Sequence, residues 1–168
     1  MKLLRRTATI LMGLGVASTA CAQQSSAYGQ AQHFIEQLSV HKGVIAWSGL
    51  EVGTQLTEVK RKWSKPLNLE RSNDEHGRSF SNVIKDGVTV RLSFFNQSGS
   101  TIFDEVCASK TVALDTKEVG ALQRLALNHL RGLSRPSPGA PPDEPLSTDS
   151  SELAIGPEGI CVRVGTAY

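Results

Sequence analysis

The sequence has little of several features that commonly assign a chain to a structural class. Aromatic residues make up only 5% of its 168 residues, and there are three cysteines. With 15 Gly and 7 Pro the composition excludes collagen, and with 39% hydrophobic residues it excludes wholesale disorder. A chain of this length buries roughly two thirds of its unfolded surface, so two full domains do not fit and folding does not depend on a metal. One globular domain is expected.

Motifs of catalysis and cofactor binding are also missing. The chain contains no Gly-x-Ser-x-Gly elbow, no Walker sequence and no dinucleotide-binding glycine pattern. Its histidines are His33, His41, His76 and His129. No two of them have the spacing of a metal site, so neither a metal nor a cofactor is expected. The enzyme hypothesis that remains is a small hydrolase using His76 or His129, although a histidine beside an apolar helix stripe, as His129 is, more often bonds a carbonyl.

The N-terminal apolar run, residues 8–17, is too short to span a bilayer and follows three basic residues. This pattern predicts a signal peptide over residues 1–22, cleaved after Ala22, and a mature protein in the periplasm. The alternative is a lipoprotein box ending at Cys21, whose acylation would anchor the protein in the outer membrane. Ser18 then stands where such boxes usually carry an aliphatic residue.

Basic and acidic residues are nearly equal in number. The chain has 18 Lys+Arg and 16 Asp+Glu, and the signal peptide holds three of the basic residues and no acidic one. Its removal leaves 15 basic against 16 acidic residues, so nucleic acid is not expected as a partner. Removal of Cys21 leaves Cys107 and Cys161. An even number of cysteines in an oxidising compartment predicts a disulfide, with two separate buried thiols as the alternative.

Apolar spacing and capping residues predict the helices. We expect a flexible tail over residues 23–30, then helices from residue 31, over residues 54–63 and over residues 115–133. Phe34, Ile35 and Leu38 share a face of the first helix, which is expected to end at residues 41–43. Thr54 is the expected N-cap of the second helix. Asp115 and Glu118 form a capping box at the start of the third.

Alternating polarity predicts strands elsewhere. Strand-like segments are residues 67–71, 80–84, 88–95, 101–107, 153–155 and 160–164. Asp86 and Gly87 suit a hairpin turn, so the central segments form a three-stranded meander. Because successive strand residues point to opposite faces, Asp104 and Glu105 are expected on different faces, as solvated charges and not as a catalytic pair. The prediction is one α+β domain over residues 31–168, an antiparallel sheet of four to six strands with two to three helices on one face and one disulfide.

Two charged segments are candidates for contact with a partner. The proline-rich loop over residues 134–150 is too long for a simple connection, and its Asp143 and Glu144 would attract a basic cleft. An exposed loop without a partner is the alternative. In the second helix, Arg61 and Lys62 belong to a basic cluster that is either a contact surface for an acidic partner or a solvated face.

Residues 50–106 combine four short features in a fixed order. They are a Val-Gly turn at residues 52–53, Val59 in the helix that follows, Pro66 at its end, and an alternating strand that closes on the polar turn of residues 96–99. This segment resembles the SmpA/OmlA family, whose members share a general fold with the β-lactamase inhibitory protein. The resemblance implies a binding module that holds other proteins in the envelope by its sheet face and loops, without catalytic residues.

The combined expectation is an exported, non-enzymatic protein that binds another protein. The first interpretation is an immunity or inhibitor protein that masks a secreted toxin or an envelope enzyme. An envelope-assembly lipoprotein of SmpA/OmlA type is the alternative if Cys21 is acylated, and only then is a membrane expected as a partner. The small hydrolase is the third interpretation.

Overall fold

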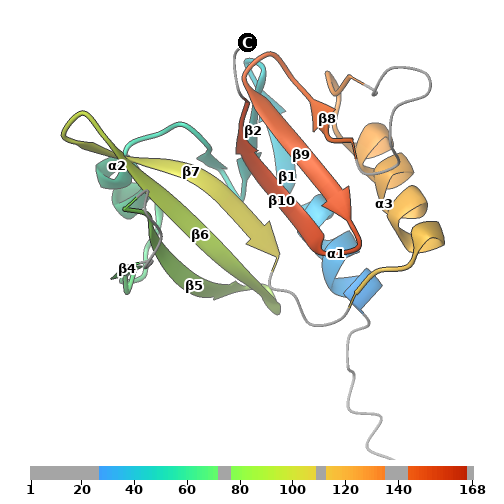
Figure 1. Cartoon of the computed structure of the whole chain (residues 1–168), viewed down its shortest axis with the longest axis horizontal. Coiled ribbons are helices and arrows are strands. Elements are labelled where there is room, and N and C mark those ends of the chain that lie inside the picture. The colour runs from blue at the N-terminus through green and yellow to red at the C-terminus, as the bar shows by residue number, and fades with distance from the viewer. Residues whose placement is uncertain (1–26, 72–76, 109–112, 135–143, 166–168) are drawn as a thin grey trace, which may run out of the picture.

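The computed structural model describes residues 27–71, 77–108, 113–134 and 144–165. The helices in this part of the chain are α1 (Ala27–Glu36), α2 (Leu56–Lys62) and α3 (Thr116–His129). The strands are β1 (Leu38–His41), β2 (Val44–Trp47), β3 (Leu50–Glu51), β4 (Glu70–Arg71), β5 (Ser79–Lys85), β6 (Val88–Gln97), β7 (Ser100–Ala108), β8 (Leu146–Ser147), β9 (Ser151–Gly156) and β10 (Gly159–Val164). They form two antiparallel sheets, a small one with the order β1-β2-β3 and a large one with the order β4-β5-β6-β7-β10-β9-β8. The fold is therefore α+β, as predicted (Figure 1).

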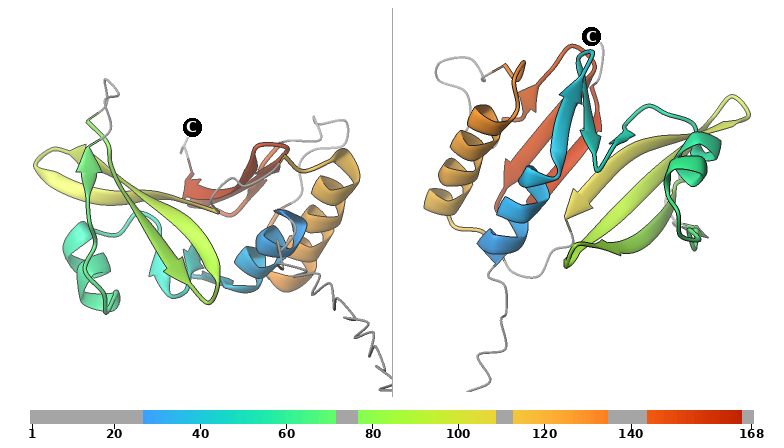
Figure 2. Two further views of the ribbon diagram at one scale, coloured as in Figure 1. Left: turned by 90° about the horizontal axis from the view of Figure 1, so that it is seen from below. Right: turned by 180° about the vertical axis from the view of Figure 1, so that it is seen from behind.

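The helices α1, α2 and α3 and the small sheet lie on one face of the large sheet (Figures 1 and 2). Helix α1 packs against β6, β7 and α3, while α2 packs against β7 and α3 against β9. The small sheet reaches the large one through a contact between β2 and β9. In the described part of the chain, no helix covers the opposite face of the large sheet.

The order of elements is similar in the two halves of the large sheet. Helix α2 precedes the meander β5-β6-β7, and α3 precedes β8, β9 and β10. Antiparallel pairing of β7 with β10 joins the two sets of strands into one continuous sheet. The large sheet has seven strands, more than the four to six expected, because the short edge strand β8 adds to the six strand segments predicted from the sequence.

The predicted disulfide between Cys107 and Cys161 is confirmed. The two cysteines face each other in register across β7 and β10, with their Cα atoms 4.1 Å apart. In antiparallel ladders such short Cα separations belong to the pairs that do not exchange hydrogen bonds, whose side chains are closest together. The bond links the terminal hairpin to the meander across 54 positions of sequence.

The core lies between the large sheet and the elements on its covered face. Phe94 and Phe103 are fully buried there, with ring centroids 5.5 Å apart. Trp47 of β2 is also fully buried and stacks between Phe34 and Trp63, with centroid distances of 6.4 and 5.7 Å. Aromatic rings stacked in this way link α1, the small sheet and the end of α2 into one core.

The capping box of α3 is confirmed and the expected cap of α2 is wrong. The Asp115 carboxylate accepts from the backbone N–H of Glu118 at 2.8 Å, and the Glu118 carboxylate accepts from the N–H of Asp115 at 2.9 Å. The N-cap of α2 is Gln55, not Thr54. The carbonyl of Thr54 accepts from the N–H of Phe103 at 2.8 Å, so this residue extends the ladder along β7 instead of starting the helix.

Helix α1 differs from its prediction at both ends. It begins at Ala27, inside the tail expected over residues 23–30, and ends at Glu36. Leu38 begins β1, because the left-handed conformations of Lys42 and Gly43, with φ of 50° and 74°, turn the chain into a hairpin with β2. None of the described helices has the length and apolar character needed to cross a membrane. The expected signal peptide, residues 1–22, lies outside the described residues.

Candidate functional site

The face of the large sheet that no described helix covers is polar and charged, and we call it the open face. One row of side chains crosses it at paired positions: Phe80, Ser93, Glu105, Arg163, Glu152 and Ser147. Side chains alternate along each strand, so the apolar residues between these positions point into the core. At the centre of the row, the basic Arg163 lies between the acidic Glu105 and Glu152.

A β-bulge in β7 brings two acidic residues to the open face. Ser93 is opposite Glu105 and Phe94 is opposite Phe103, so Asp104 is an extra residue in β7. The expectation that Asp104 and Glu105 lie on different faces is wrong, since both line the same cleft. A bulge sets two residues against one and interrupts the two-residue alternation on which the expectation depended.

The cleft on the open face has a volume of ≈ 800 Å³. Its charged lining consists of Arg78, Asp104, Glu105, Glu144, Glu152 and Arg163. Two ion pairs form within it, from Arg78 Nε to Asp104 Oδ2 at 3.4 Å and from Arg163 Nε to Glu152 Oε2 at 2.8 Å. Among the described lining residues, four carboxylates against two guanidinium groups give the cleft a net negative charge.

Glu105 is half-buried at the centre of this cleft. Burial raises the pKa of its carboxyl above the ordinary value, and the negative charge of Asp104 raises that pKa further. The guanidinium groups of Arg78, Arg163 and Arg91 act in the opposite direction without reversing the shift. The raised pKa means that the negative charge of Glu105 is poorly solvated. A cation placed in the cleft would therefore stabilise the charged form.

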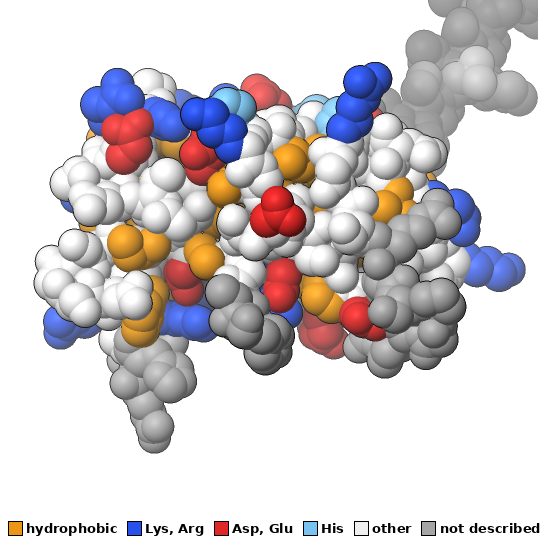
Figure 3. Space-filling view, turned by 90° about the horizontal axis from the view of Figure 1, so that it is seen from above, with side chains coloured by type: hydrophobic (Ala, Val, Ile, Leu, Met, Phe, Trp, Pro, Cys, Tyr) orange, Lys and Arg blue, Asp and Glu red, His pale blue; other side chains and the backbone are white. Residues whose placement is uncertain are grey.

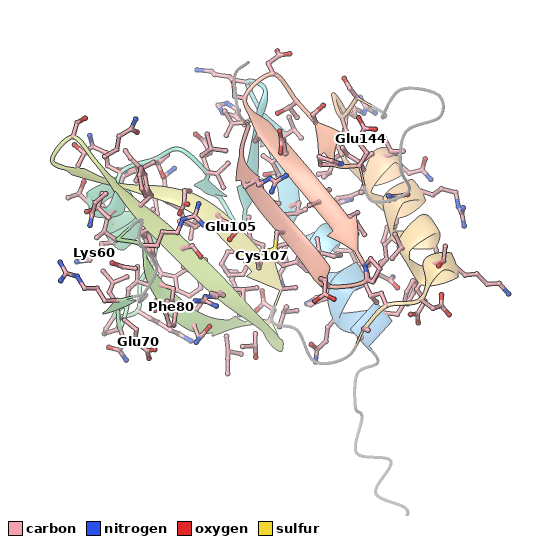
Figure 4. All side chains as sticks on the ribbon, viewed as in Figure 1. Lys60, Glu70, Phe80, Glu105, Cys107 and Glu144 are labelled. Atoms are coloured by element: carbon pink, nitrogen blue, oxygen red, sulfur yellow. A yellow bond between two sulfur atoms is a disulfide. The ribbon has the colours of Figure 1, made fainter. Side chains whose placement is uncertain are left out.

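A guanidinium group stacked on an aromatic ring extends the open face beyond the cleft. The Cζ atom of Arg91 lies 3.9 Å from the centroid of the Phe80 ring. Figure 4 shows Phe80, Glu105 and Glu144 distributed across this face, from β5 to the segment before β8. Aromatic residues and arginine are enriched in protein interfaces, where they supply most of the binding energy. This part of the open face has the composition of a contact surface.

The disulfide lies on the open face beside Glu105. The Glu105 carboxylate and the sulfur atoms of Cys107 and Cys161 lie within 4.8 Å of one another, a grouping of residue types that can hold a metal ion. The two sulfur atoms are bonded to each other and are not thiolate ligands. In the disulfide form, the cysteines thus link the strands, and the expectation that no metal binds stays a prediction.

Of the residues predicted to contact a partner, Glu144 lies in the cleft. The end of the proline-rich loop, residues 134–150, is attached to the sheet, because Ser147 pairs with Glu152 and forms an isolated bridge with Ser134. The loop therefore contributes to the open face instead of extending into solvent at this end. Asp143, His76 and Cys21 lie outside the described residues.

The basic candidates Arg61 and Lys62 have different surroundings. Arg61 donates to both carboxylate oxygens of Glu58, from Nε at 2.8 Å and from Nη2 at 2.7 Å, and this contact lowers the pKa of Glu58. Lys62 Nζ lies 3.7 Å from the same carboxylate and donates to the Gly49 carbonyl at 3.4 Å. Figure 3 shows basic side chains gathered over α2, at the upper left, with acidic ones beside them. The charge of Arg61 is thus balanced within its own helix.

Each of the three described histidines contacts an oxygen atom of another residue. The ring contacts are His33 with the Glu36 carboxylate at 3.2 Å, His41 with the Glu51 carboxylate at 3.4 Å, and His129 Nε2 with the Leu38 carbonyl at 3.2 Å. A histidine beside an apolar helix stripe more often bonds a carbonyl than acts as a catalytic base, and His129 makes such a bond. It joins the end of α3 to the start of β1.

Most of the cleft was not predicted from the sequence, but one signal was available. Glu105 precedes Cys107 by two residues and Arg163 follows Cys161 by two, so an antiparallel disulfide pair in register also sets Glu105 opposite Arg163. The contributions of Arg78 and Glu152 depend on the order of the strands in the sheet, which local patterns do not determine.

Comparisons with known proteins do not add to this description. No family model, curated protein or solved structure matches the chain. The resemblance of residues 50–106 to the SmpA/OmlA family remains a prediction. The functional conclusion therefore depends on the geometry and charge of the open face.

Proposed function

We propose that the chain is an exported, non-enzymatic module that binds another protein on its open face. The observation that carries this proposal is the acidic cleft of ≈ 800 Å³ on the side of the sheet away from the helices. Antiparallel sheets can expose one face to water, so the exposure alone is ordinary. Half-buried carboxylates around a cleft, next to an arginine stacked on an aromatic ring, are the chemistry of a recognition surface.

The negative charge of the cleft supports a partner protein with a basic segment. Arg78 and Arg163 already contact Asp104 and Glu152, so the surplus negative charge comes from the half-buried Glu105 and Glu144. A lysine or arginine side chain placed between them would offset the cost of keeping Glu105 charged. The same charge would speed association with a basic surface at low salt.

An immunity or inhibitor protein fits these features best. Enzymes and toxins that act on anionic envelope polymers need basic clefts, and an acidic surface that covers such a cleft blocks access to it. The disulfide supports export to an oxidising compartment, the periplasm, because such bonds rarely persist in the cytosol. Absence of labelling by radioactive palmitate would distinguish this soluble form from a lipoprotein acylated at Cys21.

Site-specific photo-crosslinking in intact cells tests the proposal. A photoreactive residue replaces Ser147, which faces the cleft, and a matched one replaces Lys117 of α3, on the covered side. We expect a covalent adduct with one protein from position 147 and none from position 117. Equal adducts from both positions, or none from position 147, would contradict binding at the open face.

Charge variants then test the chemistry of the contact with the purified partner. The double variant Glu105→Gln/Glu144→Gln removes the surplus charge and is expected to weaken binding by about tenfold or more, with a smaller dependence on salt. Glu36→Gln, on the exposed surface of α1, is the matched control and should bind like the parent. Unchanged affinity in the double variant would refute recognition of a basic segment.

A further inference from the structure

A second cavity lies between the end of α2 and the β5–β6 hairpin, with a volume of ≈ 230 Å³. Ser48 and Ser64 line this cavity. Its other lining residues include Lys62, Trp63, Lys65, Ile84, Lys85 and Asp86. It shares none of its described lining residues with the cleft of the open face. We call it the lysine pocket.

Three cations converge on the lysine pocket from three segments of the chain. Lys62 is the last residue of α2 and Lys85 the last residue of β5. Lys65 lies between them in sequence, directly before Pro66. Asp86 supplies the one acidic group among the described residues of the lining, so the pocket has a surplus of positive charge. The Lys62 ammonium also lies 3.7 Å from Glu58, whose carboxylate is shared with Arg61. The carboxylate of Glu58 thus offsets part of one lysine charge and leaves the pocket basic.

One wall of the pocket is apolar and firmly held. The Trp63 ring stacks on the buried Trp47 with centroids 5.7 Å apart, and Lys85 Nζ lies 5.9 Å from the Trp63 centroid, within range of a cation–π contact. An anion in this pocket would thus meet ammonium groups on one side and the indole of Trp63 on the other.

We propose that the lysine pocket binds a phosphate group carried by a small ligand with an apolar part. Lysine binds phosphate as a compact point charge, and three ammonium groups can approach a tetrahedral anion from several directions. No guanidinium lines the described part of the pocket, and two serine hydroxyls add donors. The apolar part of the ligand packs on the Trp63 ring.

Tryptophan fluorescence provides a direct test, because the chain has two tryptophans and one of them lines the pocket. The mature protein is titrated at low ionic strength with inorganic phosphate and with phenyl phosphate, whose ring represents the apolar part. We expect saturable changes with both and tighter binding of phenyl phosphate. The double variant Lys65→Gln/Lys85→Gln should lose about tenfold or more in affinity. Lys60→Gln, on the same helix but outside the pocket, should bind like the parent (Figure 4).

A lipid headgroup and a soluble phosphate ester share this chemistry, and vesicles distinguish them. The probe is sedimentation with phosphatidylcholine vesicles that contain phosphatidic acid, compared with phosphatidylcholine alone. A lipid source is assigned if binding requires phosphatidic acid and is lost in Lys65→Gln/Lys85→Gln. Binding of phenyl phosphate without sedimentation assigns a soluble ligand. No saturable binding of any of these probes, or equal binding by Lys65→Gln/Lys85→Gln with an unchanged melting temperature, would overturn the proposal. Because the variants leave the open face intact, failure here does not affect the proposed protein contact.

Discussion

The two faces of the large sheet come from the same strands and differ in what surrounds them. On the covered face, the helices and the small sheet fully bury the side chains of Leu92, Phe94, Val106 and Val162. On the open face, the alternate positions hold half-buried or exposed residues such as Glu105. Alternation along a strand makes this separation possible, because each residue can serve only one face.

Stability comes mainly from the covered face, whereas the proposed contact with a partner lies on the open face. Apolar burial contributes about 25 cal/mol per Å² of area removed from water, so the covered face supplies most of the free energy of folding. Exposed charges contribute little to that free energy. The open face can therefore vary in charge without loss of the fold, while its β7 bulge and its disulfide connect it to the core strands.

The largest expected effect comes from the covered face. Phe103→Ala removes a fully buried ring that packs on Phe94 and should lower the free energy of unfolding by about 4 kcal/mol, since the remaining cavity cannot be filled. Urea denaturation followed by circular dichroism measures the loss. Phe80→Ala, a matched substitution on the open face, should cost much less because that ring is half-exposed. Equal losses would refute the division between the faces.

The disulfide gives the next largest effect and tests whether the open face helps to hold the sheet together. Cys107→Ser/Cys161→Ser should lower the free energy of unfolding by up to about 4 kcal/mol, because the cross-link restricts the unfolded chain across 54 positions. The parent protein under a thiol reductant should lose a similar amount, whereas the double variant should not respond to reductant. If the reductant also destabilises the double variant, the loss of stability in the reduced parent has a cause other than the disulfide.

The capping box, the β5–β6 turn and the cleft differ in how far neighbouring residues in the sequence determine them. The capping box of Asp115 and Glu118 lies within one helical turn, and the β5–β6 turn has Asp86 and Gly87 in left-handed conformations, with φ of 49° and 82°. Both were predicted because each signal is contained in a few neighbouring residues. The disulfide followed from the number of cysteines left after export.

The features that were not predicted depend on distant partners. Leu38 suits both a helical face and a strand, and pairing with Trp47 selects the strand. The Thr54 carbonyl bonds to Phe103, about fifty residues away in sequence, and the bulge at Asp104 exists only because of the register of β7 against β6. The cleft combines residues of β7, β9 and β10, so its composition followed from the order of strands and not from a motif.

A smaller effect is expected from the charge of Glu105. Its pKa is raised, so the stability of the parent is complete below pH 4.5, the ordinary pKa value, and falls as the pH rises through the pKa of the folded state. Glu105→Gln removes this loss and should stabilise the protein at pH 7 by less than about 1 kcal/mol, because solvent screens a half-exposed group. Thermal melts at pH 4 and pH 7 should show the gain only at pH 7. A gain of equal size at both values would contradict a titrating cause.

The smallest effect concerns how the charges in the cleft are shared. Arg163 contacts Glu152 at 2.8 Å and stands opposite Glu105 in the sheet, so the two carboxylates compete for one guanidinium. Glu152→Gln should therefore change the free energy of unfolding by less than about 1 kcal/mol, since an exposed ion pair contributes little, yet it should lower the pKa of Glu105 by leaving Arg163 to that group. An NMR titration of the Glu105 carboxyl carbon measures that shift directly. Glu70→Gln, on the exposed edge strand β4 and outside the cleft lining, is the control and should leave the pKa unchanged. If Glu152→Gln also leaves it unchanged, Arg163 does not couple the two acids, and the cleft offers a partner two separate negative sites instead of one shared one.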